Sequence, residues 1–253
     1  MARRYLERLS VEGPGAPDQE TLGRLHRRHL ETVPFENLSI HLGEPIVLDE
    51  VELVAKIVDR HRGGFCYELN GAFGWLLRRL GYQVDLLEAG VFTDGRPGPR
   101  FDHLVLRVRL AGATDTDQPF LVDVGFGDNH LEPLLLQPGV EQLDPAGTFR
   151  LDAVAGRDFV DLRRDGRLQY RLELQPHPLA AFEAMCRYHQ SSPDSHFTRN
   201  TVCSRATTRG RVTLRSRTLI VTEDGQRTER ELDGGELLAC YRENFGLDLP
   251  RLP

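Results

Sequence analysis

The sequence predicts an α+β fold in three parts, with helices first, an antiparallel β-sheet in the middle and a mixed part at the end. Three observations predict this order. Apolar residues recur with helical spacing in 1–81, they alternate with polar residues in 82–178, and both patterns occur in 179–253. Because no internal repeat or low-complexity linker separates these segments, we expect three domains with these boundaries that pack as one unit.

The composition is that of a folded domain. Of the 253 residues, 40% are hydrophobic and 28% charged, and the net charge of −6 argues against a nucleic-acid partner. No apolar run approaches the roughly 20 residues that span a bilayer, and Met1 to Leu9 lacks the apolar core of a secretion signal. The four cysteines are scattered without a CxxC pair, so we expect no metal, reduced thiols and a cytoplasmic protein.

Three helices are expected in the first part. Pro34 ends the first of them, because the residue before a proline avoids helical geometry. Gly81 ends the third, at a position where helices often stop. The apolar stripes are formed by Leu22, Leu25, His29 and Val33, by Val51, Val54, Ile57 and Val58, and by Leu69, Phe73, Leu76, Leu77 and Leu80.

Alternating residues predict the strands of the middle part, which we expect to form a small antiparallel barrel. A second short strand follows at 120–124, and 159–174 is a hairpin around Asp165-Gly166, a pair that tolerates the positive φ of a tight turn. The first strand has Leu104, Leu106, Val108 and Leu110 on one face and His103, Val105, Arg107 and Arg109 on the other.

The last part combines both patterns. A short helix is expected at 180–188, and the segment Ser191-Ser192-Pro193-Asp194 ends it. Strands are expected at 211–214 and 219–222, and a final helix at 235–244.

Cys66 is the first candidate for chemistry. It follows Gly63-Gly64-Phe65 and stands at the expected start of a helix, where the partial positive charge of the helix end favours a thiolate. Only the thiolate is a good nucleophile. A free cysteine is usually a small buried hydrophobe, and on the residues alone the two interpretations are about equal.

A base and an acid that could serve this thiol lie further along the chain. His103 is on a strand face opposite the leucines, where a histidine alone is more often simply solvated. Asp123 stands in an apolar strand, and a buried carboxylate needs a partner. An imidazolium is an obvious candidate, because the carboxylate would fix the ring and stabilise its charge.

Glycines follow the acid directly. Gly125 and Gly127 bracket Phe126, and such turns let backbone amides approach a ligand, here the diphosphate or pantetheine arm of a cofactor. The alternative is a tight turn without a ligand. The sequence contains no Walker A loop, dinucleotide fingerprint, zincin helix or serine nucleophile elbow.

Together these blocks resemble the arylamine N-acetyltransferases of bacteria, in particular those of actinobacteria. Three segments of this chain resemble the three catalytic blocks of that family. They are Arg62-Gly63-Gly64-Phe65-Cys66-Tyr67-Glu68, Asp102-His103-Leu104-Val105 and Val122-Asp123-Val124-Gly125-Phe126-Gly127. Further similar blocks lie at 33–38, 188–197 and 244–247, so the resemblance spans nearly the whole chain in the same order.

The resemblance implies a helical N-terminal domain, a central β-barrel and a C-terminal α/β lid around a cysteine-protease-like core. It implies a Cys66-His103-Asp123 triad in which Cys66 is acetylated by acetyl-CoA and a bound amine then attacks the thioester. The implied acceptors are arylamines, arylhydrazines and N-hydroxyarylamines, and the implied role is xenobiotic metabolism. Whether the chain forms a homodimer is left open by the sequence. The resemblance places coenzyme A near Gly125, Gly127, Tyr188 and Asp194, and the acceptor or acyl group near Phe35, Phe65, Phe126 and Phe197. Because Asp194 is an acid beside an anionic cofactor, Arg100, three residues before His103, is our candidate for compensating positive charge at the cofactor site.

Three alternatives use parts of the same pattern. An amide synthase that closes macrocyclic polyketides needs the same triad but takes its acyl chain from a carrier protein. A papain-like cysteine hydrolase also uses Cys-His-Asp, but with water as the acceptor. A non-catalytic ligand-binding homologue is disfavoured by the complete triad. Acetyl transfer is the interpretation that the sequence favours.

Overall fold

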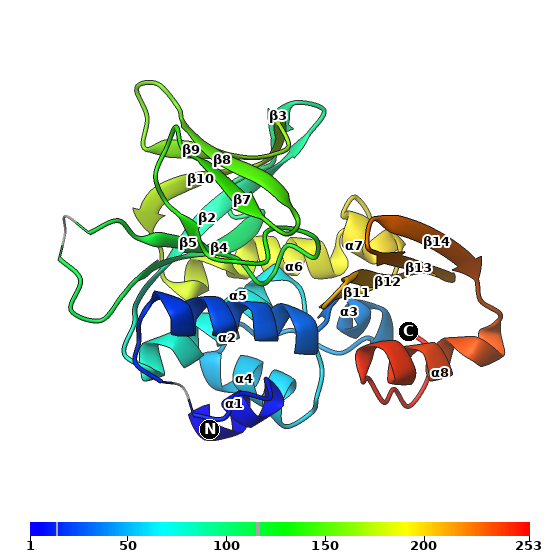
Figure 1. Cartoon of the computed structure of the whole chain (residues 1–253). Helices are drawn as coiled ribbons and strands as arrows, with labels where there is room; N and C mark the ends of the chain where they lie inside the picture. The colour runs from blue at the N-terminus through cyan, green and yellow to red at the C-terminus, as the bar shows by residue number, and fades with distance from the viewer. Residues whose placement is uncertain (14, 115–116) are drawn as a thin grey trace.

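A β-barrel stands on a layer of helices, and a smaller sheet with a terminal helix lies to one side (Figure 1). The computed structural model describes residues 1–13, 15–114 and 117–253. This arrangement confirms the α+β class and the order of helices, barrel and mixed C-terminal part. The domain boundaries at residues 81 and 178 stay a prediction. A strand of the first part pairs with the sheet of the last part, as described below, so the parts are not separate in space.

The three expected helices form as α2, α4 and α5, and two shorter helices accompany them. Asp18 and Asp49 begin α2 and α4 by accepting hydrogen bonds from the backbone amides of Thr21 and Val51. The first expected helix ends before Pro34, and Gly81 follows α5 with a φ of 100°. The helices are α1 (Ala2–Arg8), α2 (Gln19–Thr32), α3 (Leu38–Leu42), α4 (Glu50–Val58) and α5 (Cys66–Arg79).

The middle part is a nearly closed antiparallel barrel with the strand order β6-β5-β4-β2-β10-β9-β8-β7, and β3 pairs with β2. Its two edge strands are linked by the side chain of Gln142, which exchanges two hydrogen bonds with the backbone of Leu135. The expected hairpin forms, with positive φ at both Asp165 and Gly166. The strands are β2 (Gln83–Thr93), β3 (Arg96–Pro97), β4 (His103–Arg109), β5 (Phe120–Val122), β6 (Leu134–Leu135), β7 (Glu141–Asp144), β8 (Gly147–Ala153), β9 (Phe159–Arg164) and β10 (Arg167–Pro176).

The C-terminal part holds a second antiparallel sheet in the order β1-β11-β12-β13-β14. Its first strand comes from the N-terminal part, where Phe35 pairs with Ser204. The expected helix at 180–188 is longer and begins with a 3₁₀ turn, and β11 and β14 are strands that the sequence pattern did not predict. The elements are β1 (Phe35–Glu36), η1 (Leu179–Phe182), α6 (Glu183–Ser191), α7 (His196–Arg199), β11 (Val202–Thr207), β12 (Gly210–Arg215), β13 (Thr218–Glu223), β14 (Gln226–Glu231) and α8 (Gly234–Phe245).

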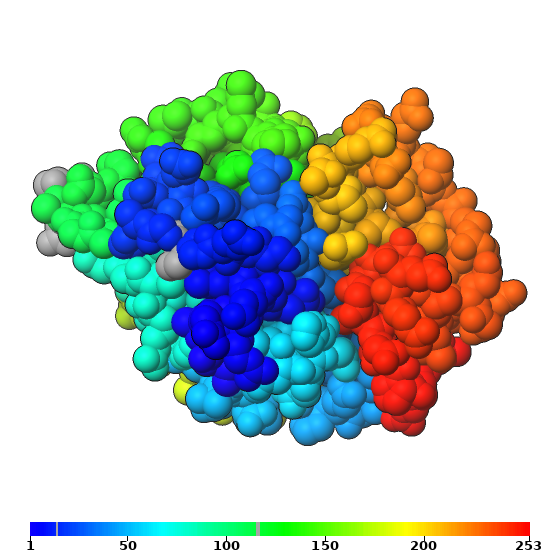
Figure 2. All heavy atoms as spheres, turned by 60° about the horizontal axis from the view of Figure 1, so that its bottom comes forward, coloured from blue at the N-terminus to red at the C-terminus, as the bar shows by residue number. Residues whose placement is uncertain are grey.

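Three hydrophobic clusters hold these layers together. Strand β4 belongs to two of them, because Leu104 and Leu106 pack against the helices while Val105 faces the barrel interior. In the third cluster, Leu38 and Leu42 pack with residues of α8, and Figure 2 shows the red C-terminal segment lying against the blue N-terminal part. Among the described residues, none of the helices has both the length and the hydropathy needed to cross a bilayer.

Candidate active site

Helix α5 begins at Cys66, so the thiol lies at its N-terminal end as the sequence predicts. The turn before it is tight. A Cβ on Gly63 would lie 1.9 Å from the carbonyl oxygen of Pro34, and one on Gly64 would lie 2.6 Å from the Glu68 carboxylate. The two glycines therefore let this turn pack closely against its neighbours. The Cys66 side chain is buried.

The structure pairs His103 with Asp123. His103 begins β4 and is buried rather than solvated, because its side of the strand faces the barrel mouth beside Phe126 and Tyr170. Its Nε2 lies 2.9 Å from Oδ2 of Asp123.

Asp123 is held as an anion. Burial opposes its ionisation, but the charge and hydrogen bond of His103 outweigh burial and keep the pKa of this carboxyl well below its usual range. The backbone amide of Gly125 and the side-chain amide of Asn70 also donate to its Oδ1, at 3.0 and 2.9 Å. A fixed carboxylate can orient the ring of His103 and stabilise an imidazolium.

Burial acts against Cys66. It raises the pKa of the thiol well above the ordinary value, the backbone amide of Leu104 opposes this rise, and the charges of Asp102 and Asp123 add to it. The expected thiolate-favouring effect of the helix end is therefore outweighed by desolvation. A thiol in this place needs a base to take its proton.

Asn70 is a site residue that the sequence analysis missed. It lies one helical turn after Cys66, and its amide nitrogen donates to Leu104 O at 2.7 Å as well as to Asp123. Its Oδ1 accepts from the amide of Val124 at 2.9 Å. Asn70 thus ties α5 to both segments that carry the His103–Asp123 pair. The i,i+4 spacing from Cys66 is a signal that could have found it.

One cleft of about 980 Å³ brings together most of the candidates from the sequence. It lies between the barrel and the C-terminal sheet, and its walls contain both the proposed nucleophile and the proposed base. The candidates that line it are Phe35, Cys66, His103, Gly125, Phe126, Gly127 and Phe197.

The two glycines after Asp123 have packing roles of their own. A Cβ on Gly125 would lie 2.7 Å from Cα of Cys66, so only glycine lets this loop approach α5. Gly127 has a φ of 93°, in the left-handed region, and a Cβ there would lie 3.2 Å from the ring of Phe35. Both observations are explained without a ligand, so contact with a cofactor stays a prediction.

Four arginines line the same cleft: Arg96, Arg211, Arg215 and Arg227. Arg211 reaches from β12 to the carbonyl of Gly127 and pairs with Asp128, and Arg227 pairs with Glu229. Neither Arg96 nor Arg215 makes an ion pair or side-chain hydrogen bond with a residue that the structure describes. Arg96 lies on β3 of the barrel and Arg215 on β12 of the C-terminal sheet, and both residues line the cleft. Their guanidinium groups suit an anionic group.

The remaining candidates lie outside the cleft lining. Phe65 is fully buried behind Phe197, and its amide already donates to Glu68 Oε2 at 3.2 Å. Tyr188 on α6 and Asp194 in the turn after it are exposed. Arg100 is bound to Glu88 and Glu173, which neutralise it, so the expectation that it adds free positive charge to the cleft is not supported.

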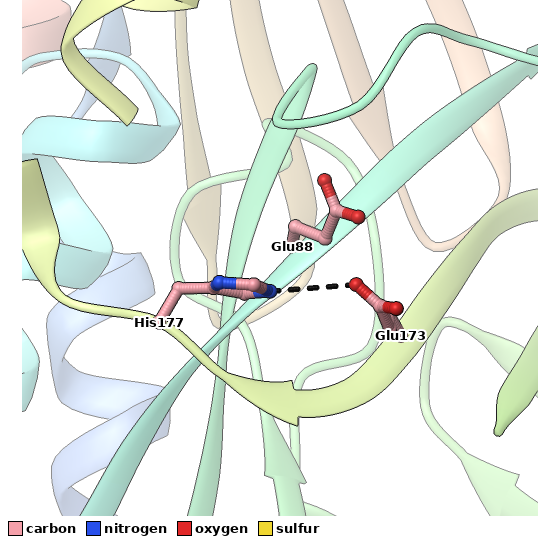
Figure 3. A group of neighbouring side chains, drawn as sticks. All are labelled: Glu88, Glu173 and His177. Atoms are coloured by element: carbon pink, nitrogen blue, oxygen red, sulfur yellow. Dashed lines mark hydrogen bonds and ion pairs between the residues drawn. The ribbon is translucent and has the colours of Figure 1, made fainter. Parts of the chain in front are cut away.

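The partners of Arg100 also form a cluster that could in principle bind a cation. Figure 3 shows Glu88, Glu173 and His177 turned toward one another. However, Arg100 supplies positive charge to both carboxylates, and the amide of Phe101 donates to Glu88 at 2.7 Å. The groups are satisfied within the chain, and we assign no metal to them.

Comparison with known proteins identifies the family. A profile of the N-acetyltransferase family matches residues 18–252. An arylamine N-acetyltransferase of Mycolicibacterium smegmatis is 35% identical and covers 97% of this chain and 91% of its own length. The chain therefore belongs to the arylamine N-acetyltransferases, a family of acyltransferase enzymes.

Solved structures agree with this assignment. An arylamine N-acetyltransferase of Nocardia farcinica matches with a TM-score of 0.86 at 35% identity, covering 98% of this chain and 90% of that one. The Mycobacterium marinum enzyme in complex with CoA matches with a TM-score of 0.89 at 29% identity, covering 98% and 93%.

Proposed function

We propose that this enzyme moves an acetyl group from acetyl-CoA, through a thioester on Cys66, to the nitrogen of an arylamine, an arylhydrazine or an N-hydroxyarylamine. One observation carries the mechanism. A thiol at a helix start and an imidazole bound to a buried carboxylate line the same cleft.

In the first half-reaction, His103 takes the proton of Cys66. The thiolate sulfur bonds to the acetyl carbonyl carbon, and the bond between that carbon and the sulfur of coenzyme A breaks. His103 returns the proton to the leaving sulfur. Asp123 stays ionised throughout and stabilises the imidazolium that forms on His103.

In the second half-reaction, the amine nitrogen attacks the acetyl group on Cys66. A carbon–nitrogen bond forms, the carbon–sulfur bond to Cys66 breaks, and His103 carries the proton of the amine to the leaving thiolate. The products are the N-acetylated amine and the free thiol. The enzyme is then ready for another cycle, as a ping-pong mechanism requires.

The charges and rings of the cleft support these two substrates. Arg96 and Arg215 suit the phosphates of a nucleotide-bearing donor, and the CoA complex of the M. marinum relative fits this choice. The rings of Phe35, Phe126 and Phe197 offer an apolar wall to an aromatic acceptor.

The test is the mass of the intact protein after brief exposure to acetyl-CoA, with and without a simple arylamine. We expect one acetyl adduct on Cys66 that disappears when the amine is added, and no adduct on Cys66→Ser. An adduct that water removes as fast as the amine would indicate a hydrolase. A wild-type protein that forms no adduct with acetyl-CoA would contradict the proposal and favour a carrier-bound donor, as in the amide synthases.

A further inference from the structure

His189 is a buried histidine that the mechanism above does not use. It lies on α6 between the barrel and the C-terminal part and is 3% exposed. Its Nε2 lies 3.2 Å from Oδ1 of Asp102, and its Nδ1 lies 3.1 Å from Oγ of Ser195. Nδ1 is therefore hydrogen-bonded, whereas Nε2 lies beside a carboxylate without making a hydrogen bond to it.

The first partner belongs to the barrel. Asp102 directly precedes His103 and lines the cleft. Its Oδ2 accepts from the amide of Val91 at 3.1 Å, and its backbone carbonyl accepts from the hydroxyl of Tyr67 at 3.0 Å. The carboxylate is therefore held by β2, and the segment that carries it is held by α5.

The second partner belongs to the turn before α7. Oγ of Ser195 accepts from the amide of Phe197 at 3.2 Å, so the same serine orients the start of α7. The ring of Phe197 meets the ring of His189 edge-on, at 5.2 Å and 90°. Phe197 then lines the cleft, with Phe65 5.5 Å behind it.

The hydrogen-bond roles are mutually consistent. Because Ser195 accepts from Phe197, its own hydroxyl hydrogen is free for Nδ1 of His189. The ring hydrogen then belongs on Nε2, which lies 3.2 Å from the carboxylate of Asp102 as a charge contact without hydrogen-bond geometry. This arrangement of the ring presents an acceptor to Ser195 and an N–H to Asp102.

We propose that His189 is a positioning residue: through Asp102 and Ser195 it fixes Phe197 relative to the segment that carries His103, and so sets the affinity for aromatic acceptors. This rests on the proposed function. The effect belongs to the second half-reaction, because the ring of the acceptor contacts Phe197 while acetylation of Cys66 does not need that contact. Loss of one hydrogen bond of about 0.5–1.5 kcal/mol corresponds to roughly a two- to tenfold loss of affinity.

The experiment separates the two half-reactions and the two partners. His189→Gln keeps an amide N–H near the place of Nε2 and the contact with Asp102. His189→Asn keeps an amide oxygen near the place of Nδ1, which can accept from the hydroxyl of Ser195. His189→Phe keeps only the ring. We expect the KM for aniline-type acceptors to rise about two- to tenfold in the two amide variants and more in His189→Phe. The acetylation rate of Cys66 and the KM for methylhydrazine, which has no ring, should stay within about twofold of wild type. The exposed Arg187→Gln on the same helix is the control.

Ser195→Ala keeps His189 and removes the hydroxyl that joins its ring to the amide of Phe197, so it tests the proposal even if His189 variants fold poorly. An unchanged arylamine KM in Ser195→Ala would overturn the proposal. So would an equal loss for methylhydrazine, because that would show general damage to the site. Failure of acetyl-CoA to acetylate wild-type Cys66 would instead refute the proposed function, and it is measured separately by mass.

Discussion

Two effects oppose each other at Cys66. The N-terminal end of α5 favours a thiolate, but burial raises the pKa of the thiol well above its ordinary value. An isolated thiol here would be neutral and unreactive at pH 7. The ionised Asp123 changes this balance, because it stabilises positive charge on His103 and thus the transfer of the proton from sulfur to the ring.

This balance predicts that Cys66 depends on His103 for its reactivity. In His103→Gln, we expect alkylation of Cys66 by iodoacetamide at pH 7 to slow at least about tenfold and to recover only at higher pH, because the thiol then keeps its raised pKa. Mass mapping assigns the label to Cys66, because the chain also has three other cysteines, all of them buried. His177→Gln is the matched control, and wild-type-like alkylation of His103→Gln would disprove the dependence of Cys66 on His103.

The unpaired arginines of the cleft give a second prediction for single residues. Arg96→Gln and Arg215→Gln should each lower kcat/KM for acetyl-CoA by roughly three- to tenfold, and added salt should reduce the difference. S-acetylpantetheine carries no phosphate, so its kcat/KM should not change. Arg227→Gln is the control, because Glu229 already neutralises that guanidinium. Equal losses with both donors would mean that the arginines do not bind phosphate.

At the scale of elements, a buried ion pair joins α4 to α5. Lys56, the only lysine of the chain, lies 2.5 Å from Glu68, and both side chains are buried. Burial raises the pKa of Glu68, and Lys56 opposes that rise. The other oxygen of Glu68 accepts from the amide of Phe65, the residue before Cys66. The pair therefore connects the packing of α4 with the start of the helix that carries the nucleophile.

Removal of one member of this pair should be costly. Lys56→Met leaves Glu68 buried without its counter-charge, and we expect a loss of about 3–5 kcal/mol in the free energy of unfolding, measured by urea denaturation. Lys56→Met with Glu68→Gln should regain much of this loss, because glutamine is neutral and still accepts from Phe65. Arg60→Gln, which breaks an exposed pair with Glu52, should change little. A double variant no more stable than Lys56→Met would refute charge burial as the cause.

Elements with strong local signals could be predicted from the sequence, and elements defined by distant partners could not. The hairpin at Asp165-Gly166 and the helices α2, α4 and α5 have turn residues or apolar stripes of their own. Strand β1 has only two residues and exists because β11 lies beside it, and every residue of β14 is exposed, so it has no alternation to detect. Pairing between distant segments leaves no local pattern.

The same distinction applies to the site. Cys66, His103 and Asp123 stand in distinctive blocks, and the structure places the first two in one cleft and pairs the last two. Asn70 and His189 act through contacts across the fold, with Asp123 and Asp102 respectively. The i,i+4 spacing of Asn70 from Cys66 is a local signal, whereas the sequence gives no such signal for His189. The ion pairs of Arg100 could not be predicted either, because its partners Glu88 and Glu173 lie on strands β2 and β10, and its contact with the cofactor stays a prediction.

For the whole molecule, the helical part and the barrel meet around one carboxylate. Asp123 follows a barrel strand, Asn70 reaches it from α5, and its backbone amide donates to Nε2 of His26 on α2 at 3.3 Å. The other nitrogen of His26 donates to Leu131 O at 2.9 Å, so this ring is neutral with its hydrogen on Nδ1. The stability of the helical layer and the geometry of the site therefore depend on the same uncharged histidine.

Burial lowers the pKa of His26 to about 3, and the neighbouring His130 adds to this effect. His26 titrates near 6.5 in the unfolded chain, so below that pH the unfolded state binds a proton that the folded state refuses. The stabilising contribution of the neutral ring is complete above about pH 6.5 and is lost as the pH falls toward 3. Asp123 contributes in this direction only below about pH 4, where an unfolded carboxyl begins to bind protons.

Stability should therefore fall between pH 7 and pH 4.5, by roughly 3 kcal/mol for His26 alone. His29, whose pKa is also lowered by burial, adds to the loss. The measurement is the free energy of unfolding in urea across this range. His26→Gln keeps hydrogen-bonding groups and cannot titrate, so it should be less stable than wild type at pH 7 but lose less on acidification. If wild type and His26→Gln lost stability with the same slope, another group would be responsible for the acid sensitivity of the fold.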